Sequence, residues 1–262
     1  MHGTYIGNQK MLVFPAWGGG KLILPSEDLG LMPELIQTGL IEAPLSRYLI
    51  NHVKESSVVM DIGANIGYFT VLLGYLVGSS GKVIAYEANP EIFSILQDNV
   101  SLNYLFDHVQ VINRAVYSTR TVLPFHISRK FIGNSSINKH DENYTKNYPG
   151  DSFIEIQLTA EPLDIYLSTI EKVDLIKIDI EGGEYQCFLG MEKLLHEGRI
   201  KKIIFENNRE MLQQDGEPFI KLLQEYSNQG ARYHDFSPQG EPVSISIGDL
   251  ANRSYPNVLM EL

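Results

Sequence analysis

A short turn with two glycines follows an acidic strand end in the first quarter of the chain. Asp61 closes the apolar run that begins at Val58, and Gly63, Asn65 and Gly67 follow at once. Gly63 lets the backbone bend sharply and approach a ligand without a Cβ clash. Gly67 permits close packing of the next segment, a predicted helix whose first N–H groups are free. The Asp61 carboxylate could hold this turn or accept a hydrogen bond from a ligand ammonium group.

The spacing of these glycines does not fit a dinucleotide-binding turn. That fingerprint requires glycine at its first, third and sixth positions. Counted from Gly63, the later two positions are Asn65 and Tyr68. An acid in the turn also suits a pyrophosphate poorly, whereas it suits a cofactor with a sulfonium and an ammonium group. The turn therefore favours a cationic cofactor over NAD.

A second acid, Glu87, ends the apolar run that begins at Val83. Its distance from the glycine turn fits an acid whose two oxygens accept both hydroxyls of a ribose. A helix-capping or solvated carboxylate is the alternative interpretation. Asn89 and Pro90 predict the N-cap and first turn of the helix that follows.

More acids gather where two later strands are predicted to end. Lys177, Asp179 and Glu181 alternate along the segment 173–180 and its end, so they project to the same side. The predicted strand 200–206 ends at Glu206 and should lie next to it. In open α/β sheets, ligands bind outside such carboxyl ends. We therefore expect several acids to converge beside the bound cofactor.

Three interpretations of these acids remain open. Asp179 or Glu181 could be a general base, because neighbouring carboxylates raise each other's pKa. Asp179 and Glu181 could instead hold a divalent cation together with Glu206 or Asn207, although no fixed spacing demands a metal and none is predicted. In the structural alternative, Lys177 pairs with Asp179 inside the sheet, and Glu181 caps the following helix.

Three motifs together resemble the FkbM family of methyltransferases. They are the segments 61–70, 86–90 and 177–184, and the resemblance extends over about residues 42–210. It implies a Rossmann-like class I methyltransferase fold, an α/β fold whose mostly parallel seven-stranded sheet has helices on both faces. It also implies S-adenosylmethionine as methyl donor and, usually, O-methylation of a hydroxyl. Gly183 stands where the family often has alanine. We predict that the catalytic residues are Asp179, Glu181 and Glu206, and that the cofactor-binding residues are Glu42, Asp61, Gly63, Asn65, Gly67, Tyr68, Glu87, Ala88 and Asn89.

Alternating strands and helices should position these residues on a parallel sheet. We predict residues 1–41 to be an N-terminal extension with two short strands, and 42–262 to be one domain. A polar insertion near 129–152 is predicted to be a lid-like binding loop. Its Ser135, Ser136, His140 and Tyr144 could reach the cofactor or acceptor, or could lie in a plain surface loop. The predicted strands are 57–62, 82–86, 108–116, 153–158, 173–180, 200–206, 231–236 and 242–247, and the predicted helices are 42–53, 67–77, 90–103, 162–168, 184–196 and 218–228.

The amino-acid composition limits the classes of molecule that the protein is expected to bind. With 21 basic and 32 acidic side chains, the net charge of −11 disfavours nucleic acid and favours a small-molecule or glycan acceptor. Cys187 is the single cysteine, so we expect a buried thiol and a cytoplasmic protein. No apolar run approaches the roughly 20 residues of a membrane span. The rival functions are a non-catalytic cofactor-binding module and, less favoured, an NAD-dependent oxidoreductase; the oligomeric state is not predicted.

Overall fold

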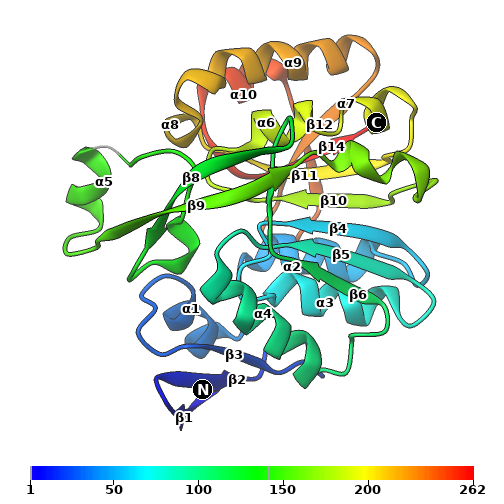
Figure 1. Cartoon of the computed structure of the whole chain (residues 1–262). Coiled ribbons are helices and arrows are strands. Elements are labelled where there is room, and N and C mark those ends of the chain that lie inside the picture. Colours follow the sequence, from blue (N-terminus) through cyan, green and yellow to red (C-terminus); the bar gives the residue numbers. More distant parts are fainter. Residues whose placement is uncertain (1, 141) are drawn as a thin grey trace.

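An eight-stranded sheet lies at the centre of the computed structural model, which describes residues 2–140 and 142–262 (Figure 1). The strand order is β13-β12-β14-β11-β10-β4-β5-β6. The strands β11, β10, β4, β5 and β6 are parallel to one another. The pairs β11–β14, β14–β12 and β12–β13 are antiparallel. In sheet order, the strands are Pro242–Ile245, Arg232–Phe236, Tyr255–Glu261, Lys202–Asn207, Leu175–Ile178, Val58–Ile62, Lys82–Tyr86 and Val109–Ile112. The mostly parallel α/β sheet predicted from the sequence is therefore confirmed.

The expected number of seven strands is wrong by one. The edge strand β13, predicted over 242–247, forms a hairpin with β12 across a turn from Ser237 to Gly240, whereas β14 was not predicted. Pro242 begins β13, which is possible because an edge strand leaves one row of backbone groups free of the ladder.

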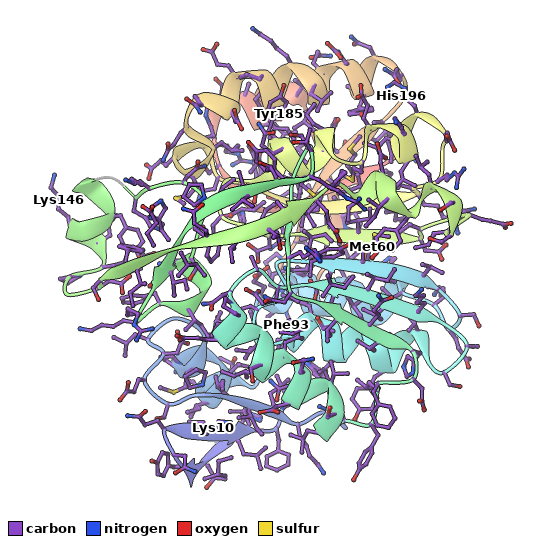
Figure 2. The ribbon with its side chains drawn as sticks, viewed as in Figure 1. Lys10, Met60, Phe93, Lys146, Tyr185 and His196 are labelled. Atoms are coloured by element: carbon purple, nitrogen blue, oxygen red, sulfur yellow. The ribbon has the colours of Figure 1, made fainter. Side chains whose placement is uncertain are left out.

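Helices cover both faces of the sheet and divide the core in two. Alternate strand residues face opposite sides, so Val59 packs into one apolar cluster and Met60 into the other. Figure 2 shows Met60 deep inside the molecule, whereas Lys10, Lys146 and His196 lie at its outside. One face carries α2 (Ala43–His52), α3 (Tyr68–Val77) and α4 (Pro90–Leu102), and the other carries α6 (Glu184–Leu189), α7 (Glu192–His196), α9 (Gly216–Asn228) and α10 (Ile247–Asn252).

The N-terminal segment forms a small sheet that is joined to the main core. Besides the two expected strands, it has a third strand and a helix. The Asn99 side chain of α4 accepts from the Ile23 N–H (2.6 Å) and donates to the carbonyls of Ile23 (2.8 Å) and Ile66 (2.7 Å). Val13 and Leu22 belong to the same apolar cluster as the main sheet. The elements are β1 (Gly3–Gly7), β2 (Lys10–Val13), β3 (Leu22–Pro25) and α1 (Leu31–Thr38).

A third sheet projects from the carboxyl ends of the main strands. The single strand predicted over 108–116 is wrong, because Asn113 binds the carbonyls of Glu87 and Ala88 and turns the chain out of the main sheet. The chain then forms β7 (Ala115–Val116), β8 (Thr121–Ser128) and β9 (Phe153–Glu161), in the order β7-β9-β8. Between β8 and β9 lie η1 (Ile132–Asn134) and α5 (Glu142–Asn147), with α5 at the outer end of the pair (Figure 1).

Three smaller features complete the fold. The helix predicted over 184–196 divides at Gly190, where a Cβ atom would lie only 2.3 Å from the Tyr117 carbonyl oxygen. The predicted helix at 162–168 is the 3-10 helix η2 (Leu163–Ser168), while α8 (Arg209–Leu212) and η3 (Gln213–Asp215) follow β11. Cys187 is fully buried, as expected. No helix within the described residues is long and apolar enough to cross a membrane.

Candidate active site

The glycine turn after β4 has the sharp bend that the sequence predicts. Gly63 has a φ of 82°, and its N–H and that of Ala64 donate to the Tyr86 carbonyl of β5. A Cβ atom on Gly63 would lie 1.8 Å from the Asp179 carbonyl oxygen, so the backbones of this turn and of β10 nearly touch. Gly67 has a φ of 90° and precedes α3. Only glycine fits the first of these positions without moving the backbone.

Glu87 binds two backbone N–H groups at the end of β5. Its Oε2 accepts from Asn65 (2.8 Å) and its Oε1 accepts from Asn89 (2.7 Å). Each carboxylate oxygen has two acceptor positions, so both retain one for a ligand. Burial raises the pKa of this carboxyl to about 7. The Asn89 side chain caps α4 by accepting from the Glu91 N–H (3.0 Å), as predicted.

Two adjoining cavities form one cleft along the ends of β4, β5 and β10. We call it the strand-end cleft. Both cavities are lined by Gly63, Asn65, Gly133, Asp179 and Glu181. One part adds mainly apolar residues around the Glu87 carboxylate, and the other adds charged and aromatic ones. The first set includes Glu87, Ala88, Phe125, Ile132, Ser135 and Ile137, and the second includes Glu42, Tyr68, Phe69, Lys177 and Glu206.

A buried lysine links two acids beneath this cleft. The Lys177 Nζ donates to Asp179 Oδ2 (3.2 Å), as in the structural alternative, and lies 3.9 Å from Asp61 Oδ1. Burial disfavours the ammonium, but the nearby carboxylates outweigh it and raise the Lys177 pKa. Asp61 is fully buried and accepts from Thr70 Oγ1 (2.6 Å) of α3. Asp61 therefore joins β4 to α3 and β10, and its contact with a ligand ammonium stays a prediction.

Glu42 and Tyr68 line the same part of the cleft. Glu42 precedes α2 with a φ of 44°, and the Asn257 amide of β14 donates to its carboxylate. Burial and the neighbouring Asp179 raise the pKa of Glu42 to about 7. The Tyr68 hydroxyl lies 3.0 Å from Ser46 Oγ, which fixes the ring at the cleft wall. Both residues therefore lie where a cofactor contact was expected.

Three carboxylates converge at the other side of the cleft, and we call them the acid cluster. Asp179, Glu181 and Glu206 each offer an oxygen within 4.8 Å of the others. Glu181 has a φ of 53°, and Ser136 Oγ donates to its carbonyl (2.6 Å). Burial raises the pKa of Glu181 and of Glu206, and repulsion adds to it, from Asp179 on Glu181 and from Glu181 on Glu206. The three acids predicted to be catalytic are thus brought together.

The structural alternative for Glu181 is wrong. Glu184, one turn later, accepts from the Ile180 N–H (3.1 Å) and the Gly182 N–H (3.0 Å), whereas no side chain caps the start of α6. This role of Glu184 was not predicted, although the residue closes the motif 177–184. Asn207, considered as a metal ligand, donates to carbonyls of α10 and the residue after it, and so faces away from the acid cluster.

A further cavity of about 590 Å³ opens beyond the acid cluster, and we call it the outer cavity. Glu181 and Glu206 line both this cavity and the strand-end cleft. Its other wall is aromatic: the ring centroids of His140 and Tyr144 lie 3.9 Å apart, and those of Tyr144 and Tyr148 lie 4.5 Å apart. His140 and Tyr144 of the predicted lid therefore line a cavity and do not lie in a plain surface loop.

The fold and this site together define a class of protein. A parallel sheet with a glycine turn after β4, an acid at the end of β5 and further acids at the ends of β10 and β11 forms a Rossmann-like fold of the class I methyltransferase type. Ligand clefts in such sheets lie outside the carboxyl ends of the strands. The strand-end cleft and the outer cavity both lie there.

A family model described as the methyltransferase FkbM domain matches residues 61–233, more than half of the chain. The chain belongs to this family, and the resemblance found in its motifs is confirmed. Methyltransferase sdnD of Sordaria araneosa is 23% identical over 168 residues, which cover 56% of this chain and 64% of that protein. A protein-L-isoaspartate O-methyltransferase of Caenorhabditis elegans is 32% identical over 53 residues, which cover 20% of this chain and 24% of that protein. The chain spans less than two thirds of the length of these curated relatives.

Two solved structures have a similar main chain. An O-methyltransferase from Bacillus cereus, described in complex with SAH, superposes with a TM-score of 0.42 at 16% identity, covering 90% of this chain and 83% of that one. A SAM-dependent O-methyltransferase from Thermotoga maritima gives 0.43 at 14% identity, covering 96% and 77%.

Proposed function

We propose that the protein is an S-adenosylmethionine-dependent methyltransferase that methylates a hydroxyl group of a small metabolite, sugar or glycan. Family membership supports the methyltransferase activity. The observation that carries the proposal is the junction of two cavities at Glu181 and Glu206. One cavity suits the methyl donor and the other suits the acceptor, so the two reactants would meet beside carboxylates.

The strand-end cleft fits S-adenosylmethionine in chemistry and charge. The free acceptor positions on Glu87 suit two ribose hydroxyls, and the absent side chain of Gly63 leaves room for close approach. The carboxylates of Glu42 and Asp179 outnumber the single cation of Lys177 that lines the same part of the cleft, and this negative excess matches an ammonium and a sulfonium. When bound, the cofactor supplies an electrophilic methyl carbon on a positively charged sulfur.

The acid cluster would then act on the acceptor hydroxyl. The acceptor oxygen forms a bond to the methyl carbon as the carbon–sulfur bond breaks, and the hydroxyl proton passes to a carboxylate. A hydroxyl is too weak an acid to be deprotonated in advance, so Asp179 or Glu181 accepts the proton late, and positioning supplies most of the acceleration. The raised pKa of Glu181 improves it as a base.

The insertion at 129–152 would be the lid over the acceptor. Its residues contribute to both cavities, Ser135 to the strand-end cleft and Tyr144 to the outer cavity. Stacked rings bury an apolar sugar or metabolite face, while neighbouring carboxylates accept from its hydroxyls. We accordingly propose residues 42–262 as the catalytic domain and 1–41 as its N-terminal extension.

The first test is calorimetric titration of the protein with S-adenosylmethionine, S-adenosylhomocysteine and NAD. Micromolar affinity for the first two and none for NAD is expected; binding of NAD alone would overturn the proposal. Turnover is then measured as S-adenosylhomocysteine released with acceptors that present a hydroxyl, an amine or a carboxylate. Asp179→Asn should retain cofactor binding and lose turnover. A protein that binds the cofactor and methylates none of these classes would be a binding module instead.

A further inference from the structure

We propose that the acid cluster binds a hard divalent cation, of the Mg²⁺ or Mn²⁺ type, at the junction of the strand-end cleft and the outer cavity. The ligands would be one carboxylate oxygen each from Asp179, Glu181 and Glu206. The cation would bind whether or not the protein transfers a methyl group. A role of the cation in catalysis, by contrast, rests on the proposed methyltransferase function.

The first observation is the convergence of the three carboxylates from different elements. Asp179 and Glu181 follow β10, Glu206 lies in the neighbouring β11, and their oxygens lie within 4.8 Å of one another. The backbone holds them there: the Asp179 N–H donates to the Ile62 carbonyl (3.0 Å), and Glu181 keeps a left-handed φ that few non-glycine residues adopt. Such placement of like charges costs free energy unless something compensates it.

The second observation is an oxygen of Glu206 that lacks a partner. Its Oε2 is buried and accepts no hydrogen bond from the described residues, while Oε1 accepts only a long one from Asn208 (3.3 Å). A buried carboxylate oxygen without a donor is costly. The Glu206 carboxylate belongs to the acid cluster, so a cation bound there would supply the missing interaction.

Two lysines lie near the acid cluster, and only Asp179 of the cluster pairs with one of them. Lys177 contacts Asp179 and Asp61. Lys139 lines the outer cavity but is 79% exposed, and its Nζ lies 3.9 Å from Glu155. Lys177 thus offsets the charge of Asp179, but neither lysine forms an ion pair with Glu181 or Glu206 in the described part of the chain.

The ligand chemistry selects the kind of cation. Three carboxylate oxygens, with no sulfur or imidazole among them, suit Mg²⁺ or Mn²⁺ better than zinc or copper. Three protein ligands leave coordination positions open to water and to an acceptor hydroxyl. A hydroxyl bound to the cation would become more acidic, and its proton would pass to the oxygen of Asp179 or Glu181 that does not bind the cation as the hydroxyl oxygen accepts the methyl group.

The test is titration of the purified full chain with Mn²⁺, followed by the loss of the free-ion signal in electron paramagnetic resonance. One Mn²⁺ per chain is expected, displaceable by Mg²⁺. Glu206→Gln should weaken Mn²⁺ binding by roughly tenfold or more. Glu210→Gln is the matched control, because this exposed acid lines the outer cavity outside the cluster, and its Mn²⁺ affinity should stay unchanged.

Glu206→Gln removes an unpartnered buried charge, so we expect it to fold; Glu181→Gln serves as a second variant. Absence of Mn²⁺ binding in the wild type, or equal weakening by Glu206→Gln and Glu210→Gln, would overturn the proposal. A parallel titration with S-adenosylhomocysteine separates the two hypotheses. Retained nucleoside binding without Mn²⁺ binding would refute the cation site and leave the proposed function intact.

Discussion

Replacing Glu87 by glutamine tests the proposed ribose contact most directly. The carboxylate has two oxygens that bind the N–H groups of Asn65 and Asn89, which leaves one acceptor position on each for a ribose hydroxyl. In Glu87→Gln one oxygen becomes an NH₂ group, so one hydroxyl loses its charged acceptor. Such a hydrogen bond contributes about 1.5–3 kcal/mol, or roughly a 10- to 150-fold loss of affinity.

The same variant should remove a pH dependence of cofactor binding. Because hydroxyls donate to the carboxylate, binding favours its ionised form. With a pKa of about 7, about 9% of the Glu87 carboxyls are ionised at pH 6 and about 91% at pH 8. Affinity should therefore rise about tenfold from pH 6 to pH 8 in the wild type and less in Glu87→Gln.

The assay is calorimetric titration with S-adenosylhomocysteine at pH 6, 7 and 8. Glu42 also has a pKa of about 7 and lines the cleft, so Glu42→Gln is the matched control. This variant should keep the part of the pH dependence of cofactor affinity that is due to Glu87. Thermal unfolding checks that Glu87→Gln is folded, since one backbone N–H loses its acceptor at a cost of about 1–3 kcal/mol. Wild-type affinity in a folded Glu87→Gln variant would refute the ribose assignment.

Three further substitutions test the contacts that hold the site in place, through the free energy of unfolding measured in urea. Gly63→Ala places a Cβ atom 1.8 Å from the Asp179 carbonyl oxygen at a positive φ, so it should cost more than about 3 kcal/mol; an unchanged midpoint would contradict the tight approach. Lys177→Met leaves Asp61 and Asp179 without their buried cation and should cost about 3–5 kcal/mol, with a smaller loss arguing that water reaches the pair. Asn99→Ala breaks the link between β3 and the glycine turn and should cost about 1–3 kcal/mol, whereas wild-type stability would mean that the link is dispensable.

The parallel half of the fold could be predicted from the sequence because its signals are local. The strands β4 and β5 are short apolar runs, the turn between β4 and α3 shows its glycines, and Asn89 with Pro90 marks the start of α4. In each of these segments, the secondary structure that the local sequence favours is the one found in the fold. The convergence of Asp179 and Glu206 followed from the rule that neighbouring parallel strands end at one edge.

Two strands beyond the N-terminal segment escaped prediction, and each contains proline. Pro124 lies within β8, where it is tolerated because β8 is at the edge of its sheet. Pro256 lies within β14, opposite the irregularity between Phe205 and Asn207 where the ladder of β11 is interrupted. Pairing between distant segments decides both cases, and a single sequence does not reveal it. The outer cavity between the acid cluster and the β8–β9 insertion was hidden for the same reason.

The position of β14 has a consequence for how the chain folds. β12 and β13 precede β14 in the chain, yet β14 lies between β12 and β11 in the sheet. The hairpin of β12 and β13 therefore has no place on the sheet until β14 has paired with β11. Asn257, which binds Glu42 at the strand-end cleft, arrives with the same strand. We therefore expect the site to become complete only in the folding step that pairs β14 with β11.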